Sequence, residues 1–254
     1  MKLKKLFFSP ELAGKQGEIK TAVKLNWINI LGKSGRILQN VYVPMGNGST
    51  TEIDLLYITQ KGIFVIESKN YTGYIFGSEK NKNWTVTLYA GKDWLGRKRV
   101  DKYHFYNPIW QNRTHIKFLS KYISRDIPFV SVIVFSDSSE LKSIDYNDSD
   151  DFVVCNRGKL HSVIAKIWKS CPDILCDSEI EALYNYLLPL TRQTADVKRQ
   201  HIQDVHKREN GTNKCPQCGG KLVLRTAKKG PNAGGSFYGC SNYPKCTFTK
   251  SCDK

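Results

Sequence analysis

The sequence contains no apolar run that approaches the roughly 20 residues needed to cross a bilayer. Residues 1–10 include basic side chains but only a fragment of an apolar region, which is too short for a secretory signal peptide. No convincing internal repeat is present. These absences predict an intracellular, cytoplasmic protein with no membrane partner, in a compartment where thiols stay reduced.

Acidic residues are also scarce. The 254 residues include 23 Asp and Glu against 39 Lys and Arg, a formal net charge of +16. A positive excess of this size favours nucleic acid as a partner. Hydrophobic residues make up 40% and charged residues 24%, as in ordinary soluble proteins, so the chain can build one sizeable core and a small module. Nothing in the composition predicts an oligomeric state.

Apolar periodicity predicts alternating helices and strands. Residues 10–30 have helical spacing, with Leu12, Ile19, Ala22, Val23 and Trp27 recurring every three or four residues. Gly91 to Lys102 is polar and basic, and we expect an exposed loop there. The remaining predicted helices are 107–124, 159–168 and 178–188, and the strands are 36–43, 73–76, 84–89, 129–135 and 152–155.

The central stretch runs from Thr51 to Asn70 and reads as two β-prone runs around a short turn containing Gly62. Folding about this turn places position 54 opposite position 68, give or take one residue. Side chains alternate along a strand, so Glu67 and Lys69 point the same way. We therefore expect Asp54, Glu67 and Lys69 to meet at one end of the hairpin.

Two carboxylates at a strand end make an oxygen-rich site suited to Mg²⁺ or Mn²⁺. Such an ion activates water and neutralises charge on a phosphate, and a neighbouring lysine can orient the water or stabilise the transition state. Glu18 on the first helix and Gln111 on the helix after residue 107 are further candidates. The alternative is that all these side chains are ordinary solvated surface groups.

The eight cysteines cluster toward the C-terminus. Cys215 and Cys218 form a CxxC knuckle, and Cys240 and Cys246 supply a second pair, which together predict a closed, structural Zn²⁺ site. Cys252 is left over; it could replace Cys246, but we interpret it as a free thiol. Cys155, Cys171 and Cys176 lack metal-site spacing.

Aromatic and basic residues alternate around this knuckle, a composition suited to binding single-stranded nucleic acid. The alternative is that some rings only pack the small module. The candidate nucleic-acid-binding residues are Arg225, Lys228, Lys229, Phe237, Tyr238, Tyr243 and Lys245.

The N-terminal half resembles a known family. The matching residues are Gly14-Lys15-Gln16-Gly17-Glu18, Ile53-Asp54, Gly62 through Asn70 with Gly73, Trp84, Asn107-Pro108, Gln111 and His115. They resemble the nuclease-related domain, NERD, within the PD-(D/E)xK superfamily. The resemblance implies an α/β, restriction-endonuclease-like αβββαβ core with a mixed central sheet. It also implies metal-dependent phosphodiester cleavage, with Asp54 and Glu67 as metal ligands, Lys69 assisting the water, and Glu18 and Gln111 contributing.

Residues 214 to about 252 resemble the zinc-ribbon repeats of bacterial type IA topoisomerases, through Cys215-Pro216-Gln217-Cys218-Gly219, Phe237-Tyr238-Gly239-Cys240-Ser241 and Tyr243-Pro244-Lys245-Cys246. That family binds DNA, largely single-stranded.

We therefore expect four regions: a nuclease-like core at 1–125, the remainder of the same α/β domain at 126–191, a basic linker at 192–213 and a zinc ribbon at 214–254. The predicted function is a metal-dependent DNA nuclease with a DNA-binding tail. A non-catalytic DNA-binding protein and an RNA nuclease remain alternatives.

Overall fold

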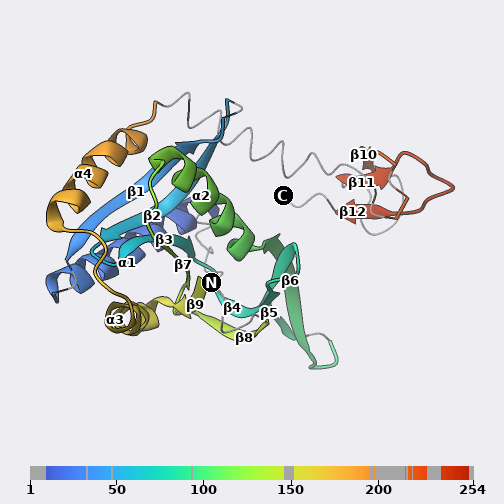
Figure 1. Ribbon diagram of the computed structural model, residues 1–254. Helices are drawn as coiled ribbons and strands as arrows, with labels where there is room; N and C mark the ends of the chain where they lie inside the picture. The colour runs from blue at the N-terminus through green and yellow to red at the C-terminus, as the bar shows by residue number, and fades with distance from the viewer. Residues whose placement is uncertain are drawn as a thin grey trace. The chain divides into compact units, whose positions relative to one another are not determined.

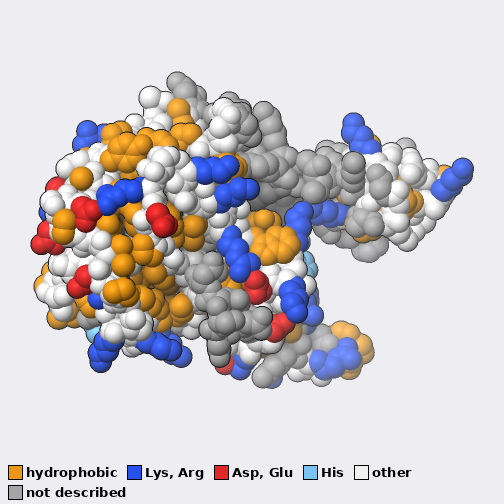
Figure 2. Space-filling view, in the orientation of Figure 1, with side chains coloured by type: hydrophobic (Ala, Val, Ile, Leu, Met, Phe, Trp, Pro, Cys, Tyr) orange, Lys and Arg blue, Asp and Glu red, His pale blue; other side chains and the backbone are white. Residues whose placement is uncertain are grey.

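The computed structural model describes residues 10–194 apart from 33, 47, 93 and 146–151, and in the C-terminal region residues 197, 215, 217–218, 220–227 and 236–251. The chain divides into two compact units, Met1–Thr194 and Ala195–Lys254 (Figure 1). None of the described helices is long and apolar enough to cross a membrane. Figure 2 shows basic side chains spread widely over one face of the molecule.

The larger unit mixes helices and strands. Its helices are α1 (Pro10–Ile30), α2 (Pro108–Ile123), α3 (Leu160–Ser170) and α4 (Asp177–Leu187), with 3₁₀ turns η1 (Arg157–Lys159) and η2 (Leu188–Thr191). Its strands are β1 (Gly35–Pro44), β2 (Thr50–Thr59), β3 (Gly62–Lys69), β4 (Gly73–Ser78), β5 (Asn83–Lys92), β6 (Lys98–Tyr106), β7 (Phe129–Phe135), β8 (Ser139–Asp145) and β9 (Phe152–Asn156). The expected α/β class with mixed sheets is confirmed.

The first sheet has the order β1-β2-β3-β7-β9, antiparallel from β1 to β3 and parallel from β3 to β9. One face packs on α1 and α3 through residues such as Leu25 and Ile164. The other packs on α2 and α4 through residues such as Leu119 and Leu183. Both faces of β3 are buried, which explains its continuous apolar run from Ile63 to Ile66. The sheet is therefore the middle layer of three (Figure 1).

The predicted helix at residues 10–30 is confirmed. The residues that it buries, however, are mostly not those that the apolar spacing of the sequence indicated. Ile19, Val23 and Trp27 are 57%, 50% and 61% exposed, whereas Ala22, Leu25 and Ile28 are buried. The close approach of α1 to β3 sets this rotation. A Cβ at Gly17 would lie 2.6 Å from Cβ of Asn70, so only glycine fits there.

The second sheet has the order β6-β5-β4-β8 and packs on β7, β9 and the start of α2. Trp84 is its largest buried side chain and stacks parallel to Phe135 of β7, with the ring centroids 6.0 Å apart. The expected loop over 91–102 is wrong in part, because residues 98–102 pair with β5 as the start of β6. Residues 99–104 of this edge strand are exposed on both faces, so this part of β6 shows no apolar alternation.

The β2–β3 hairpin is confirmed, with a two-residue turn at Gln60 and Lys61. Gly62 follows that turn with a φ of +109°, which favours glycine. The pairing of Thr59 with Gly62 and of Leu55 with Ile66 brings Asp54 level with Glu67. This is one residue from the expected position 68 and within the stated tolerance.

The side chains of β1 and β2 exchange faces at Asn40 and Asp54. Leu38 and Leu56 face α2 and α4 before the exchange, and Val41 and Ile53 face them after it, although the two strands keep one register. Asn40 has a φ of +52°, and the ladder omits the Asn40–Asp54 pair. The exchange turns the next pair, Tyr42 and Glu52, toward the α1 side.

The smaller unit is a three-stranded sheet of order β10-β11-β12, formed by Leu222–Thr226, Ser236–Cys240 and Thr249–Ser251. Among the described residues of this unit, the buried hydrophobic side chains are Leu222 and three cysteines, with Tyr238 and Phe248 packed against them. So small a core cannot stabilise a fold without a further constraint such as a metal. Most of the expected linker at 192–213 lies outside the described residues.

Candidate functional site

One open pocket of about 410 Å³ lies where β2 and β3 separate. All five candidate catalytic residues line it: Glu18, Asp54, Glu67, Lys69 and Gln111. They come from α1, β2, β3 and α2, so the pocket requires the assembled three-layer fold. Tyr71, just beyond β3, lines the same pocket.

The expected trio forms direct contacts. Lys69 Nζ lies 2.7 Å from Glu67 Oε1 and donates to Gln111 Oε1 at 3.1 Å. Asp54 Oδ2 accepts a 2.7 Å hydrogen bond from the backbone N–H of Ser68. That N–H would have continued the β2–β3 ladder, so Asp54 takes the place of a backbone acceptor where the strands part.

The environments of the two carboxylates drive their pKa values in opposite directions. Burial and the charge of Glu67 raise the pKa of Asp54 well above its usual value. Burial also opposes ionisation of Glu67, but Lys69 and His115 outweigh it and lower the pKa of Glu67. Burial opposes the charge of Lys69, but Glu67 and Asp54 raise its pKa. Glu67 and Lys69 are therefore charged, while the charge on Asp54 is disfavoured in this pocket.

Glu18 extends the acidic cluster from α1. Burial and the nearby Glu52 and Glu67 raise the pKa of Glu18. Glu52 was not predicted; the exchange of faces at Asp54 turns it toward Glu18, and its Oε1 accepts a 2.7 Å hydrogen bond from the Tyr42 hydroxyl. Strict alternation along β2 places Glu52 with Leu56 instead, so the sequence pattern gave no signal for it.

His115 holds the other side of Glu67 from α2. It is 4% exposed, and its Nε2 lies 3.3 Å from Glu67 Oε2. Its Nδ1 is 2.7 Å from Thr51 Oγ1. About two turns earlier, the side-chain oxygen of Asn107 accepts a hydrogen bond from the Ile109 N–H and fixes the start of the helix. The cap and the buried histidine together fix the position of Gln111.

A buried hydrogen-bond chain supports Asp54 from the opposite side. Arg157 Nε donates to Thr21 Oγ1 at 3.0 Å, and Thr21 Oγ1 lies 3.0 Å from Ser68 Oγ. Ser68 in turn holds Asp54 through its backbone N–H. Arg157 comes from η1, 88 residues after Lys69 in the sequence. No sequence motif indicated this connection.

The pocket suits a divalent cation on two observations. Glu67 Oε2 is buried, and among the described residues its 3.3 Å contact with His115 Nε2 lacks hydrogen-bond geometry, so this oxygen accepts no hydrogen bond. Asp54 and Glu18 lie among carboxylates that oppose one another's ionisation, a conflict that a bound cation relieves. Carboxylate oxygens are the ligands that Mg²⁺ and Mn²⁺ prefer. Asp54 and Glu67 are therefore the residues that fit such an ion.

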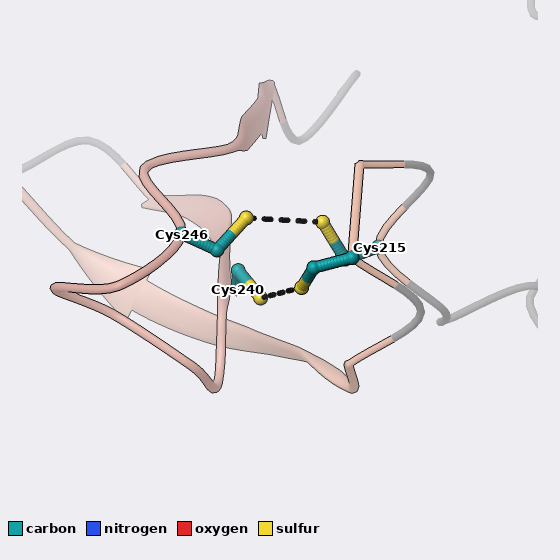
Figure 3. Close-up of side chains that lie close together, drawn as sticks. Cys215, Cys240 and Cys246 are labelled. Atoms are coloured by element: carbon teal, nitrogen blue, oxygen red, sulfur yellow. Dashed lines mark hydrogen bonds between the residues drawn. The ribbon is translucent and has the colours of Figure 1, made fainter.

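The four expected zinc ligands converge in the smaller unit. The sulfurs of Cys215, Cys218, Cys240 and Cys246 all lie within 4.8 Å of one another. Figure 3 shows the Cys215 sulfur turned toward that of Cys246. The Cys215–Cys246 and Cys218–Cys240 sulfur distances are 3.5 Å and 3.3 Å, close to the roughly 3.8 Å of a tetrahedral zinc–thiolate site. The backbone N–H of Gly220 lowers the pKa of Cys218 to about 7, which favours the thiolate.

The candidate nucleic-acid residues of this unit differ in exposure. Tyr243 is 62% exposed, and the Arg225 guanidinium lies 5.8 Å from its ring centroid. Lys245 is exposed, whereas Phe237 is half-buried and Tyr238 packs on the cysteine cluster. The alternative that some rings only pack the module holds for Tyr238. Lys228, Lys229 and Cys252 lie outside the described residues.

The fold and the two sites define an α/β protein with an acid–lysine pocket, joined to a four-cysteine module. Residues 13–136 match the nuclease-related domain, and residues 212–254 match the topoisomerase DNA-binding C4 zinc finger. The chain belongs to the nuclease-related domain family and carries a topoisomerase-type C4 zinc finger at its C-terminus.

An uncharacterized protein of Bacillus anthracis is 30% identical over 200 residues, covering 78% of this chain and 86% of that protein. DNA topoisomerase 1 of Archaeoglobus fulgidus is 56% identical over 48 residues, covering 19% of this chain and 7% of the topoisomerase. An uncharacterized protein of Escherichia coli K12 is 47% identical over 36 residues, 14% of this chain and 17% of that protein. No solved structure matches the chain.

Proposed function

We propose that this protein is a cytoplasmic, metal-dependent nuclease that hydrolyses DNA phosphodiester bonds, with the C-terminal zinc finger as a DNA grip. The observation that carries the proposal is the contact of Lys69 with Glu67 beside Asp54, in a pocket open to solvent. The order α1, β1, β2, β3, α2 and β7, with β4–β6 inserted, agrees with the αβββαβ core expected of the PD-(D/E)xK superfamily.

Asp54 and Glu67 would hold Mg²⁺ or Mn²⁺, which supplies an acidified water and charge neutralisation at the phosphate. Lys69 is held by Glu67 and Gln111, so its ammonium points into the pocket with little freedom to turn away. A fixed ammonium can orient the attacking water and stabilise the negative charge that develops on the phosphate. His115 and Ser68 keep the two carboxylates in position.

The direct test is incubation of the purified protein with plasmid, linear duplex DNA, single-stranded DNA and RNA, each with Mg²⁺, Mn²⁺ or EDTA. Cleavage of DNA that requires a metal supports the proposal. Cleavage of RNA alone would favour the RNA nuclease, and binding without cleavage of any substrate would favour the non-catalytic DNA-binding protein.

Lys69→Ala is expected to retain metal binding but to lower the cleavage rate about 10²–10³-fold, because it removes one electrostatic contact and no carboxylate ligand. Single-turnover cleavage rates across a Mn²⁺ titration measure both effects. Lys166→Ala is a suitable control, because Lys166 is exposed on α3 and lies outside the pocket. A Lys69→Ala rate equal to that of wild type would remove this lysine from the mechanism.

The region after residue 191 should carry much of the affinity for nucleic acid, because it holds thirteen basic residues against four acidic ones. Counterion release predicts that log K falls with log salt, with a slope of about −0.7 per neutralised phosphate of a single strand. The contribution of this region is measured by comparing the nucleic-acid affinity of the full chain with that of a 1–195 fragment across a salt series. If the full chain and the fragment have equal affinities and equal salt slopes, the region after residue 191 does not contribute to nucleic-acid binding.

A further inference from the structure

The second sheet has an outer face that its core does not use. Cross-strand partners point to the same face, so the register places Tyr74, Thr87 and Lys102 in one row and Phe76, Thr85 and His104 in the next. Tyr89 and Val100 continue this face toward the tip of the β5–β6 hairpin. The opposite face, with Ile75, Trp84 and Val86, is buried in the core.

The outer face exposes aromatic rings to an unusual degree. Tyr74, Phe76 and Tyr89 are 46%, 39% and 64% exposed. The middle strand places small threonines between the rings of β4 and the side chains of β6, so the rings stand above their surroundings. Contiguous exposed aromatic surface on a soluble protein marks an interaction site more often than scattered single residues do.

Positive charge surrounds these rings. Residues 92–102 contain five basic residues against two acidic ones, and Lys92, Arg99 and Lys102 are exposed. Lys142 of β8 lies 5.0 Å from the ring centroid of Tyr74. Figure 2 shows basic and hydrophobic side chains next to one another on the projecting hairpin tip. Rings with adjacent cations offer stacking to bases and ion pairs to phosphates.

Protection of an edge strand does not explain this composition. Lysines and arginines on β6 would discourage pairing with another sheet, as on many edge strands. Exposed rings have the opposite effect, because they add apolar surface to the same hairpin. Trp94 at the tip is 89% exposed. The rings therefore require a ligand-based explanation.

The face is also connected to the pocket. Tyr71 lines the pocket, and β4 begins two residues later at Gly73. The Tyr71 ring packs 4.6 Å from that of Phe105 on β6. The sheet that carries the exposed rings is thus anchored where Lys69 and Gln111 meet.

We propose that the outer face of the second sheet, centred on Tyr74, Phe76 and Tyr89, binds single-stranded DNA and directs it to the pocket. This inference specifies the substrate surface of the proposed nuclease and rests on that proposal. DNA is chosen over RNA because the same chain carries a topoisomerase-type DNA-binding finger. Stacking gives little sequence preference, since every base has a π-face.

The test uses the full-length protein with no added Mg²⁺ or Mn²⁺ and no chelator, so that binding is measured without cleavage and the zinc finger keeps its metal. The Tyr74→Ala/Tyr89→Ala double variant is expected to bind labelled oligothymidylate more weakly, by about tenfold for each ring lost. Trp27→Ala is the matched control, because Trp27 is similarly exposed on α1, and should bind as wild type does. The thermal unfolding midpoints of all variants show whether they are folded. If the double variant is unstable, the binding measurement is made with Tyr89→Ala alone.

Photocrosslinking to 5-iodouracil-substituted oligothymidylate separates this surface from the zinc finger. Crosslinked peptides from β4–β6 are expected in addition to those from the tail. Wild-type affinity of the double variant, with crosslinks only in residues 215–251, would overturn the inference. If wild type binds oligouridylate as tightly as oligothymidylate, and the double variant loses the same affinity for both, the choice of DNA would be overturned.

A double variant that binds DNA as wild type does but self-associates differently would assign the face to protein contacts. If the wild-type protein binds DNA through this face but cleaves none of the substrates, the proposed nuclease function would be overturned, whereas the proposed DNA-binding surface would stand.

Discussion

Glu67→Gln or Asp54→Asn is expected to abolish metal-dependent DNA cleavage, lowering the rate by at least about 10³-fold. Each substitution replaces a charged oxygen ligand by a neutral amide of nearly the same shape. Glu67→Gln also removes the ion pair that fixes Lys69, so two contributions are lost together. Cleavage rates and the Mn²⁺ concentration for half-maximal activity measure the effect.

Controls separate loss of chemistry from loss of fold. Glu181→Gln changes a partly exposed acid on α4, outside the pocket, and should cut DNA at the wild-type rate. Circular dichroism, and DNA binding without added Mg²⁺ or Mn²⁺, should be unchanged for both pocket variants. Glu67 is only 2% exposed, but the amide can still accept from Lys69. Wild-type-level cleavage by Glu67→Gln would place the activity elsewhere or in a contaminant.

Full-length protein is expected to contain one zinc per chain, and Cys218→Ser/Cys240→Ser together should eliminate it. Structural zinc contributes on the order of 10–16 kcal/mol to small domains, far more than the core around Leu222 can supply. The smaller unit should therefore lose its folded structure, which hydrogen exchange of β10 and β11 would detect. Elemental analysis gives the zinc content directly.

Cys176→Ser is the matched control, because Cys176 is exposed and outside the cluster. It should keep one zinc per chain. Zinc retained by the double cysteine variant, or absent from wild type purified without chelators, would contradict the assignment. Cleavage by the larger unit should survive loss of zinc, since none of the pocket residues comes from the finger.

The sequence predicted the candidate sites best where the residues with the relevant chemistry are close to one another in the chain. The apolar run into Glu67 and Lys69, with Asp54 in the partner strand, predicted a convergence that depends only on one tight turn. The cysteine spacing predicted the cluster for the same reason, because its pairs are local. Short sequence separations leave few alternative arrangements.

Residues that act through long-range packing were missed. Arg157 reaches Thr21 across 136 positions in the sequence, and His115 reaches Thr51 across 64. The buried face of α1 includes Gly17, which lies tightly against Asn70 and which the apolar spacing of the helix did not indicate. Such contacts depend on how the layers pack together, and no local pattern of residue types encodes them.

The exchange of faces at Asn40 and Asp54 constrains how this fold can vary. Both strands turn over at the same level while their pairing register is preserved. A residue gained or lost in β1 alone would reverse its side chains relative to β2 and expose an apolar row. Relatives should therefore change length on both strands together at this level, or on neither. In an alignment of the family, this constraint would appear as gaps that occur in both strands together, and not as paired changes of residue type.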